Sequence, residues 1–123
     1  MQDTNKYGFI SGGAIFDMLD RAALEYINKT WPSTANENWF TKRSVIHFNL
    51  QVCSMDNMEI VVQKTGKDKK YEETFGHDNR KVVIALVDSI HKRIHAVAGF
   101  FFVKADKNHC KADFRYTVDE DKV

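Results

Sequence analysis

Hydrophobic residues recur every three or four positions in the stretch that follows a pair of glycines at positions 12 and 13. This spacing is typical of an amphipathic helix that buries one face. Ser11 or either glycine can start the helix, and Trp31-Pro32 ends it, since the residue before a proline is driven out of the helical region. The apolar face of this predicted helix consists of Ile15, Met18, Leu19, Ala22, Ala23, Tyr26 and Ile27.

From residue 38 onward the pattern changes to alternation of apolar and polar residues or to short apolar runs, which are typical of strands. The first strand keeps Phe40, Ser44, Ile46, Phe48, Leu50 and Val52 on one parity, interrupted by Lys42. Polar segments at 64–70, 76–80 and 89–94 separate the candidates as turns. The predicted strands are 39–52, 58–64, 71–75, 81–88 and 95–104.

The last two predicted strands are apolar on both parities, in the runs KVVIALVDS and HAVAGFFFV. A strand that is apolar on both faces is central and covered by a helix, or it belongs to an interface between subunits. We expect both: a sheet wrapped around the long helix, with its other face or its edge in a dimer. Burial within a monomer is the alternative. One helix followed by about five antiparallel strands makes an α+β fold.

The chain has 123 residues, which suits a single domain, and we expect it to span 1–104, with 105–123 as a polar tail or edge segment. With 18 Lys and Arg against 17 Asp and Glu, the charge balance argues against nucleic-acid binding that depends on a basic field. Two cysteines cannot form a disulfide scaffold. No apolar run is long enough to span a bilayer. With no visible secretion signal, these features favour the cytoplasm.

Asp20 does not fit the face of the helix on which it lies. Its neighbours one turn away, Phe16, Ala23 and Leu24, offer no cation, and Asp17 carries the same charge. A carboxylate in this position is a general base or nucleophile, or it is bonded to a group from elsewhere in the fold. An ordinary boundary aspartate bonded to a loop amide is the alternative.

The two glycines, Gly12 and Gly13, lie where the amides of the predicted helix have no intrahelical partner and the helix dipole is positive. Such amides can form an oxyanion hole, and the missing side chains let a substrate oxygen approach. About 10 Å of helix separates them from Asp20. This distance requires a substrate that lies along the helix, or a site completed by a second subunit. Close packing of helix on sheet is the alternative role for the glycines.

These residues resemble a known family. Asp3-Thr4-Asn5, Gly8, Gly12-Gly13 and Asp20 match the motif of the hotdog-fold acyl-CoA thioester hydrolases. A looser match places Phe48, Val52 and Asp56 on the following strand and turn. The resemblance runs from Asp3 to about Val103 and implies a hotdog fold, a long central helix wrapped by an antiparallel sheet, which dimerises through sheet edges.

The resemblance also implies a function, an acyl-CoA thioesterase that needs no cofactor or metal. It assigns Asp20 as general base or nucleophile, Asn5 of the facing subunit to the substrate carbonyl or water, and Gly12 and Gly13 to the oxyanion. For substrate binding we name Phe48 and, as cations for the CoA phosphates, Arg43, Arg80 and Lys81. The implied partners are an acyl-CoA and a second copy of the chain, in a homodimer or higher oligomer.

The sequence departs from the family pattern at several points. Gln51 replaces the usual proline, Met55 replaces a glycine, and the Thr-Ser pair of a later strand is absent near 80–83. These changes keep open a non-catalytic acyl-CoA-binding protein of the same fold. A hydratase is disfavoured, since such relatives use a histidine near the helix start and the first histidine here is His47. The five histidines show no metal-binding motif.

Overall fold

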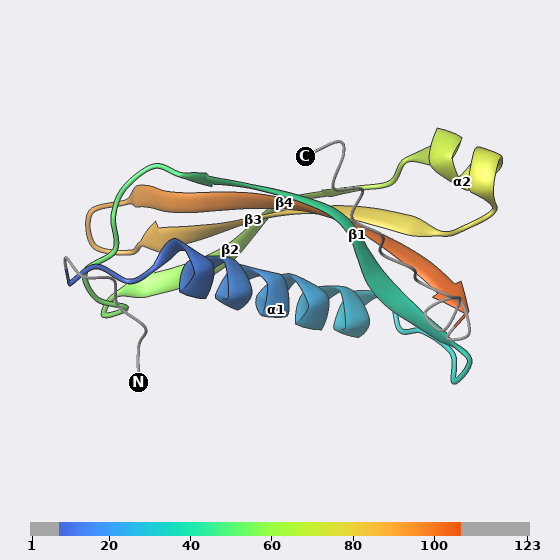
Figure 1. Ribbon diagram of the computed structural model, residues 1–123, viewed down its shortest axis with the longest axis horizontal. Coiled ribbons are helices and arrows are strands. Elements are labelled where there is room, and N and C mark those ends of the chain that lie inside the picture. The colour runs from blue at the N-terminus through green and yellow to red at the C-terminus, as the bar shows by residue number, and fades with distance from the viewer. Residues whose placement is uncertain (1–7, 107–123) are drawn as a thin grey trace, which may run out of the picture.

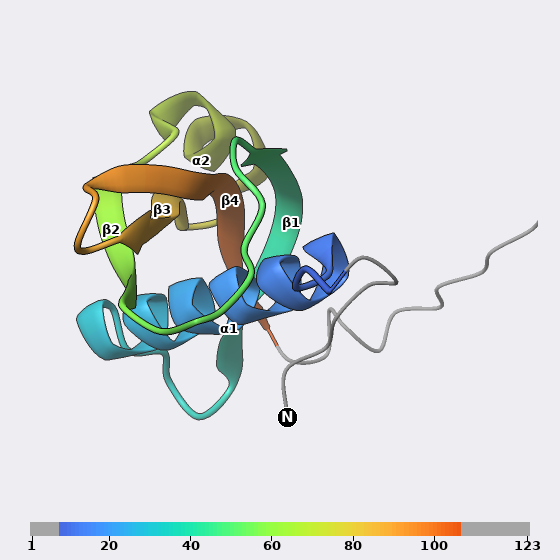
Figure 2. The same cartoon turned by 90° about the vertical axis from the view of Figure 1, so that its left-hand side faces the viewer.

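The computed structural model describes residues 8–106, and every structural statement below refers to them. One long helix packs against a curved antiparallel sheet, and a short helix lies on the other side of that sheet (Figures 1 and 2). The four strands follow the order β1-β4-β3-β2. The elements are α1 (Gly12–Thr30), β1 (Glu37–Phe48), β2 (Met58–Gly66), α2 (Lys69–Phe75), β3 (Asn79–Asp88) and β4 (Arg93–Asp106).

Helix α1 confirms the predicted helix. The side chain of Ser11 caps its start by accepting a hydrogen bond from the amide of Ala14, which satisfies one donor that has no partner within the helix. Trp31 caps its end, just before Pro32. One residue per turn is buried against the sheet, namely Ile15, Leu19, Ala23 and Ile27. This stripe forms the helix side of the hydrophobic core.

Strands β3 and β4 are the two central strands, which explains why both are apolar on both parities. Their inner side chains include Val82, Ile84, Phe100 and Phe102, all of which are buried in the core with α1. Their outer side chains point to the opposite face, where α2 covers one end of the sheet (Figure 1). The two edges of the sheet are β1 and β2.

Strand β1 contains a β-bulge that sequence parity did not predict. The pairing of β1 with β4 shifts register between Thr41 and Arg43, so Lys42 is the extra residue. A bulge lets two residues oppose one, and side chains beyond it change face. The single parity predicted that Phe40 and Ile46 share a face. Because of the bulge, they lie on opposite faces of the sheet. Trp39 points into the core before the bulge, and Ile46 packs against the core after it.

The predicted strand 71–75 is wrong, because these residues belong to helix α2. Asp68 caps the helix by accepting a hydrogen bond from the amide of Tyr71. Gly76 ends it in the left-handed conformation, which glycine adopts without strain. Tyr71 and Phe75 are one turn apart on the same face, which is the helical spacing. The structure thus describes four strands in residues 8–106, where about five were expected.

The last strand extends to Asp106, beyond the expected domain boundary at residue 104. Ala105 is buried, so the core continues to that point. The rest of the expected tail, 107–123, lies outside the described residues. Within 8–106 we find no helix with the length and apolar character that crossing a membrane requires.

Candidate functional site

A cleft of about 390 Å³ opens beside the first turn of α1. Its walls come from the helix start and from the segment that follows β1, and the backbone amide of Ile10 binds the carbonyl of Val52 across 2.7 Å to join the two. Ser11 caps Ala14, whereas no hydrogen bond to the amide of Gly12 or Gly13 is found among residues 8–106. Free amides at a helix start next to a cleft suit a developing negative charge.

Phe48, at the end of β1, lies against this helix start. A Cβ atom built on Gly12 would stand 3.1 Å from Cζ of the Phe48 ring, whereas one on Gly13 would meet nothing within 4 Å. Phe48 is 51% exposed, so its ring lines the cleft and is not packed in the hydrophobic core. The structure thus brings together two of the predicted site residues, Gly12 and Phe48, whereas Gly13 follows Gly12 in the helix but does not line the cleft.

Asp20 lies on the flank of α1 that faces strand β1. The hydroxyl of Thr41 donates a hydrogen bond to Oδ1 of Asp20, with 3.5 Å between the oxygens, which is long for a hydroxyl–carboxylate bond. Asp17, the like charge noted in the sequence, is paired with Arg21 at 2.9 Å. No cation pairs with Asp20 within residues 8–106.

A single chain does not bring Asp20 to the glycine amides. Asp20 comes eight positions after Gly12, and eight residues of helix rise about 12 Å along the axis. Asn5 lies outside the described residues. Asp20, however, faces β1, and Phe48 is the last residue of that strand. Strand β1 is an edge strand of twelve residues, most of which are exposed. An edge strand of this length is a surface on which another strand can pair.

The three predicted cations for the CoA phosphates lie in different surroundings. The guanidinium of Arg80 bonds Asp78 and stacks 4.8 Å from the ring centroid of Trp31, so it is already engaged. Burial alone would raise the pKa of Asp78, but Lys67 and Arg80 outweigh it and lower that pKa. Arg43 and Lys81 both line a shallow cleft of about 270 Å³ on the face of the sheet opposite α1.

His95 is the one histidine whose ring is buried in the described region, and it supports the loop at the cleft. Its Nδ1 donates to the carbonyl of Gln51 at 3.0 Å, and its own carbonyl accepts from the amides of Asn49 and Leu50. Within residues 8–106 its Nε2 has no hydrogen-bond partner and lies 4.0 Å from Oδ2 of Asp88. No group of three or more metal-ligating side chains is found among residues 8–106.

Thr41 is the neighbour of Asp20 that the sequence did not reveal. Twenty-one positions separate the two residues, and no local spacing rule connects a helix residue to the strand beyond the next loop. The parity of β1 would have pointed to Thr41 only if the bulge at Lys42 had been known, since Thr41 lies just before it.

The comparisons with known proteins found the fold in solved structures only. No family model matches the chain, and no curated protein does. YbaW, a probable thioesterase from Escherichia coli, matches with a TM-score of 0.60 and 12% identity over 86% of this chain and 77% of its own. Slr0204, a 1,4-dihydroxy-2-naphthoyl-CoA thioesterase from Synechocystis, matches with a TM-score of 0.64 and 12% identity over 85% and 75%.

A third similar structure, smu.793 from Streptococcus mutans bound to acetyl-CoA, has a TM-score of 0.56 and 17% identity over 87% of this chain and 78% of its own. At these identities the likeness concerns the fold. The arrangement of α1 against the antiparallel sheet confirms the α+β architecture expected from the sequence resemblance. This chain therefore has the hotdog fold seen in the thioesterase structures.

Proposed function

We propose that this protein is an acyl-CoA thioesterase that hydrolyses a fatty or short acyl-CoA to the free acid and CoA. The observation that carries this proposal is Asp20, a carboxylate on the flank of α1 that forms no ion pair within residues 8–106 and accepts a long hydrogen bond from Thr41. The hotdog fold supports it, because several similar structures are thioesterases and one holds acetyl-CoA.

The chemistry needs a base or nucleophile and a site for negative charge. In one route Asp20 takes a proton from water, and the oxygen of that water attacks the thioester carbonyl carbon. In the other, the Asp20 carboxylate attacks that carbon directly and water later cleaves the mixed anhydride. In both routes the amides of Gly12 and Gly13 bind the oxyanion, and the C–S bond breaks with its electron pair on the CoA thiolate.

We further propose that the active site is completed by a second copy of the chain. Antiparallel pairing of two β1 edges would place Asp20 of one copy near the helix start of the other. This arrangement removes the gap of about 12 Å along the helix axis within one chain. Asn5 of the facing subunit remains the group proposed to bind the carbonyl or water. A homodimer or a higher oligomer is the expected assembly.

The cleft at the helix start provides the place for the thioester and the first part of the acyl chain, with Phe48 as an apolar wall. Arg43 and Lys81 are the proposed cations for the CoA phosphates, and no ion pair engages either of them within residues 8–106. Arg80 stays in this proposal only as a supporting residue, because Asp78 and Trp31 already hold its guanidinium.

The test is release of free thiol from acyl-CoAs of increasing chain length. We expect Asp20→Asn to lower kcat by at least about a hundredfold, the order expected for loss of a general base. Asp17→Asn is the matched control, because it removes an exposed carboxylate of the same helix whose partner is Arg21. That control should keep nearly full activity.

One outcome would replace the proposal with the alternative function. If the oligomeric protein binds acyl-CoA tightly but releases no thiol with any chain length, the chain is a non-catalytic acyl-CoA-binding protein. In that case Asp20→Asn would leave binding unchanged. Loss of activity in both aspartate variants would instead show that the effect comes from the helix surface and not from Asp20.

A further inference from the structure

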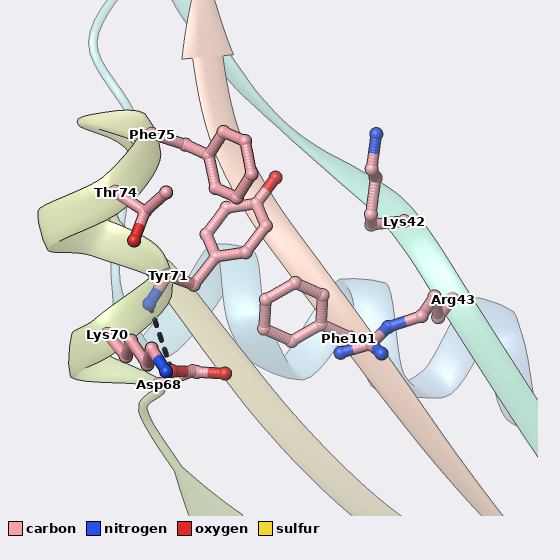
Figure 3. A pocket seen from close by; sticks show the side chains of 8 residues that line it. All are labelled: Lys42, Arg43, Asp68, Lys70, Tyr71, Thr74, Phe75 and Phe101. Carbon is pink, nitrogen blue, oxygen red and sulfur yellow. Dashed lines mark hydrogen bonds between the residues drawn. The ribbon is translucent and has the colours of Figure 1, made fainter.

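A third cleft, of about 500 Å³, lies between α2 and the outer face of the sheet. Figure 1 shows α2 on the side of the sheet opposite α1, so this cleft is separated by the sheet from the core. Figure 3 shows side chains from α2, β1 and β4 around it. Its volume is in the range of sites that bind small molecules.

Helix α2 is a fixed wall of this cleft. Asn79, which is fully buried at the start of β3, accepts a hydrogen bond from the amide of Asp68 and donates one to the carbonyl of Asp68. Asp68 caps the helix. Lys67 adds ion pairs to Glu72 at 2.7 Å and to Asp78 at 3.0 Å. The cleft is therefore built into the fold.

Aromatic rings form one side of the cleft. The Tyr71 ring meets Phe101 edge-on, with centroids 5.0 Å apart, and lies 4.7 Å from the ring of Phe75. Phe75 is 60% exposed, so its ring is open to solvent at the cleft. The Tyr71 hydroxyl has no hydrogen-bond partner among residues 8–106. These rings offer a stacking surface and one polar group (Figure 3).

The β-bulge directs two consecutive cations to the same cleft. Neighbouring residues of a regular strand point to opposite faces. Lys42, however, is the extra residue of the bulge and Arg43 follows it, and both line this cleft. The guanidinium of Arg43 lies 4.9 Å from the ring centroid of Phe101, which leaves its edge free for an anion. Bulges often redirect side chains beside functional sites.

The cleft carries an excess of positive charge. Lys70 joins Lys42 and Arg43, and none of the three forms an ion pair within residues 8–106. Asp68 is the carboxylate that lines the cleft, and its Oδ1 accepts the capping hydrogen bond from Tyr71. Three cations against one carboxylate leave two positive charges. Such an excess favours an anionic ligand such as a phosphate group, which as a monoester carries about −1.5 to −2 at neutral pH.

We propose that this cleft binds a nucleotide, with its base against Tyr71 and Phe75 and its phosphate on Arg43 and Lys42, the two cations on the β1 side of the cleft (Figure 3). The ligand needs both an aromatic base and a phosphate. A ligand with a base and no phosphate would leave the cations of the cleft unpaired, and a ligand with a phosphate and no base would leave the aromatic side chains exposed. This inference does not depend on thioesterase activity, because binding alone tests it. The nucleotide site and the proposed thioesterase site share one residue, Arg43.

The experiment is calorimetric titration of the full chain with ADP, with adenosine and with inorganic phosphate. We expect one ADP site per chain, with affinity at least about tenfold higher than for either fragment, which corresponds to 1.4 kcal/mol. Lys42→Gln, Arg43→Gln and Tyr71→Leu should each weaken ADP binding by about tenfold. Lys64→Gln, a cation on β2 outside the cleft, is the matched control and should bind ADP normally.

Lys42 and Arg43 are exposed, so their variants do not disturb the core, and circular dichroism will confirm that each variant folds. A competition with CoA identifies the source of the nucleotide. If CoA displaces ADP and the same variants weaken CoA, the ligand is the nucleotide end of CoA; if ADP binds in the presence of saturating CoA, it is a free nucleotide. Both results support the site. Three results would overturn the site. Neither ADP nor CoA shows saturable binding, phosphate alone binds as tightly as ADP, or none of the three variants changes the affinity for ADP.

Discussion

The ring of Phe48 fills the space into which a side chain at Gly12 would extend, at 3.1 Å from the position of its Cβ. This contact joins the start of α1 to the end of the edge strand β1 at the candidate site. The contacting atom is the far end of a half-exposed ring, which can move outward. An added methyl group would therefore disturb the cleft more than the fold.

We expect Gly12→Ala to lower the kcat/KM for acyl-CoA by at least about tenfold while the free energy of unfolding changes by less than about 1 kcal/mol, because alanine favours the helix and Phe48 can yield. Thiol release and urea unfolding measure the two effects. Gly13→Ala is the comparison for contact with Phe48: it keeps its backbone amide, its Cβ would meet nothing within 4 Å, and it should lose less activity than Gly12→Ala. Equal loss of activity in both variants would show that contact with Phe48 does not matter.

The helix and the two central strands could be predicted from the sequence because their signals are local. The stripe from Ile15 to Ile27 repeats with the helical period, and central strands between two neighbours are apolar on both faces. Asp20 could be singled out for the same reason, since its helical neighbours include no cation. These features depend on residues that are close together along the chain.

Two features of the fold depend on contacts that no local rule supplies. Helix α2 had local signals, a capping aspartate at 68 and a glycine at 76, but its aromatic residues were interpreted as strand residues. The bulge at Lys42 is a property of the pairing with β4, which only the folded sheet defines. The hydrogen bond from Thr41 to Asp20 depends on where that pairing places β1, and the proposed completion of the site would require a second copy.

The proposed assembly through β1 predicts the effect of a charge on that strand. Val45 on β1 is 59% exposed. Val45→Lys would place like charges on adjacent copies and weaken strand pairing. By light scattering we expect the native mass to be at least about 28 kDa, twice the chain mass of 14.2 kDa, and the variant to shift toward the single-chain mass.

The opposite edge provides the control for this experiment. Val61 on β2 is 40% exposed, and Val61→Lys places the same charge on the other edge strand. This variant should keep the oligomer and the thioesterase activity. If Val61→Lys dissociates the protein and Val45→Lys does not, the subunits associate through β2, and the shared site between two β1 edges is wrong.

Asn79 connects α2 to the sheet with three hydrogen bonds, one accepted from the amide of Asp68 and two donated to the carbonyls of Asp68 and His77. Asn79→Ala would remove these three partly buried hydrogen bonds, and we expect it to lower the free energy of unfolding by about 2–4 kcal/mol. Asn28→Ala removes one exposed side-chain hydrogen bond and should cost less than about 1 kcal/mol. Urea unfolding compares the two. A loss no greater than that of the control would mean that α2 is not held by Asn79.

Asp88 predicts how stability responds to acid. Its pKa is lowered to about 2, first by the backbone amide of His91, then by the His91 side chain and by the amide of Ile90. The unfolded chain has the ordinary pKa of about 3.9. Because the folded pKa is the lower one, Asp88 stabilises the fold fully above about pH 4, and this contribution is lost as the pH falls toward 2.

Asp88→Asn isolates this contribution, because the amide oxygen can still accept from the backbone at 90 and 91 but no longer titrates. Urea unfolding between pH 2 and pH 5 should show the native chain more stable than the variant at pH 5, with the difference shrinking as the pH approaches 2. A gap between Asp88→Asn and the native chain that is independent of pH would mean that the turn depends on the shape of residue 88 and not on its charge.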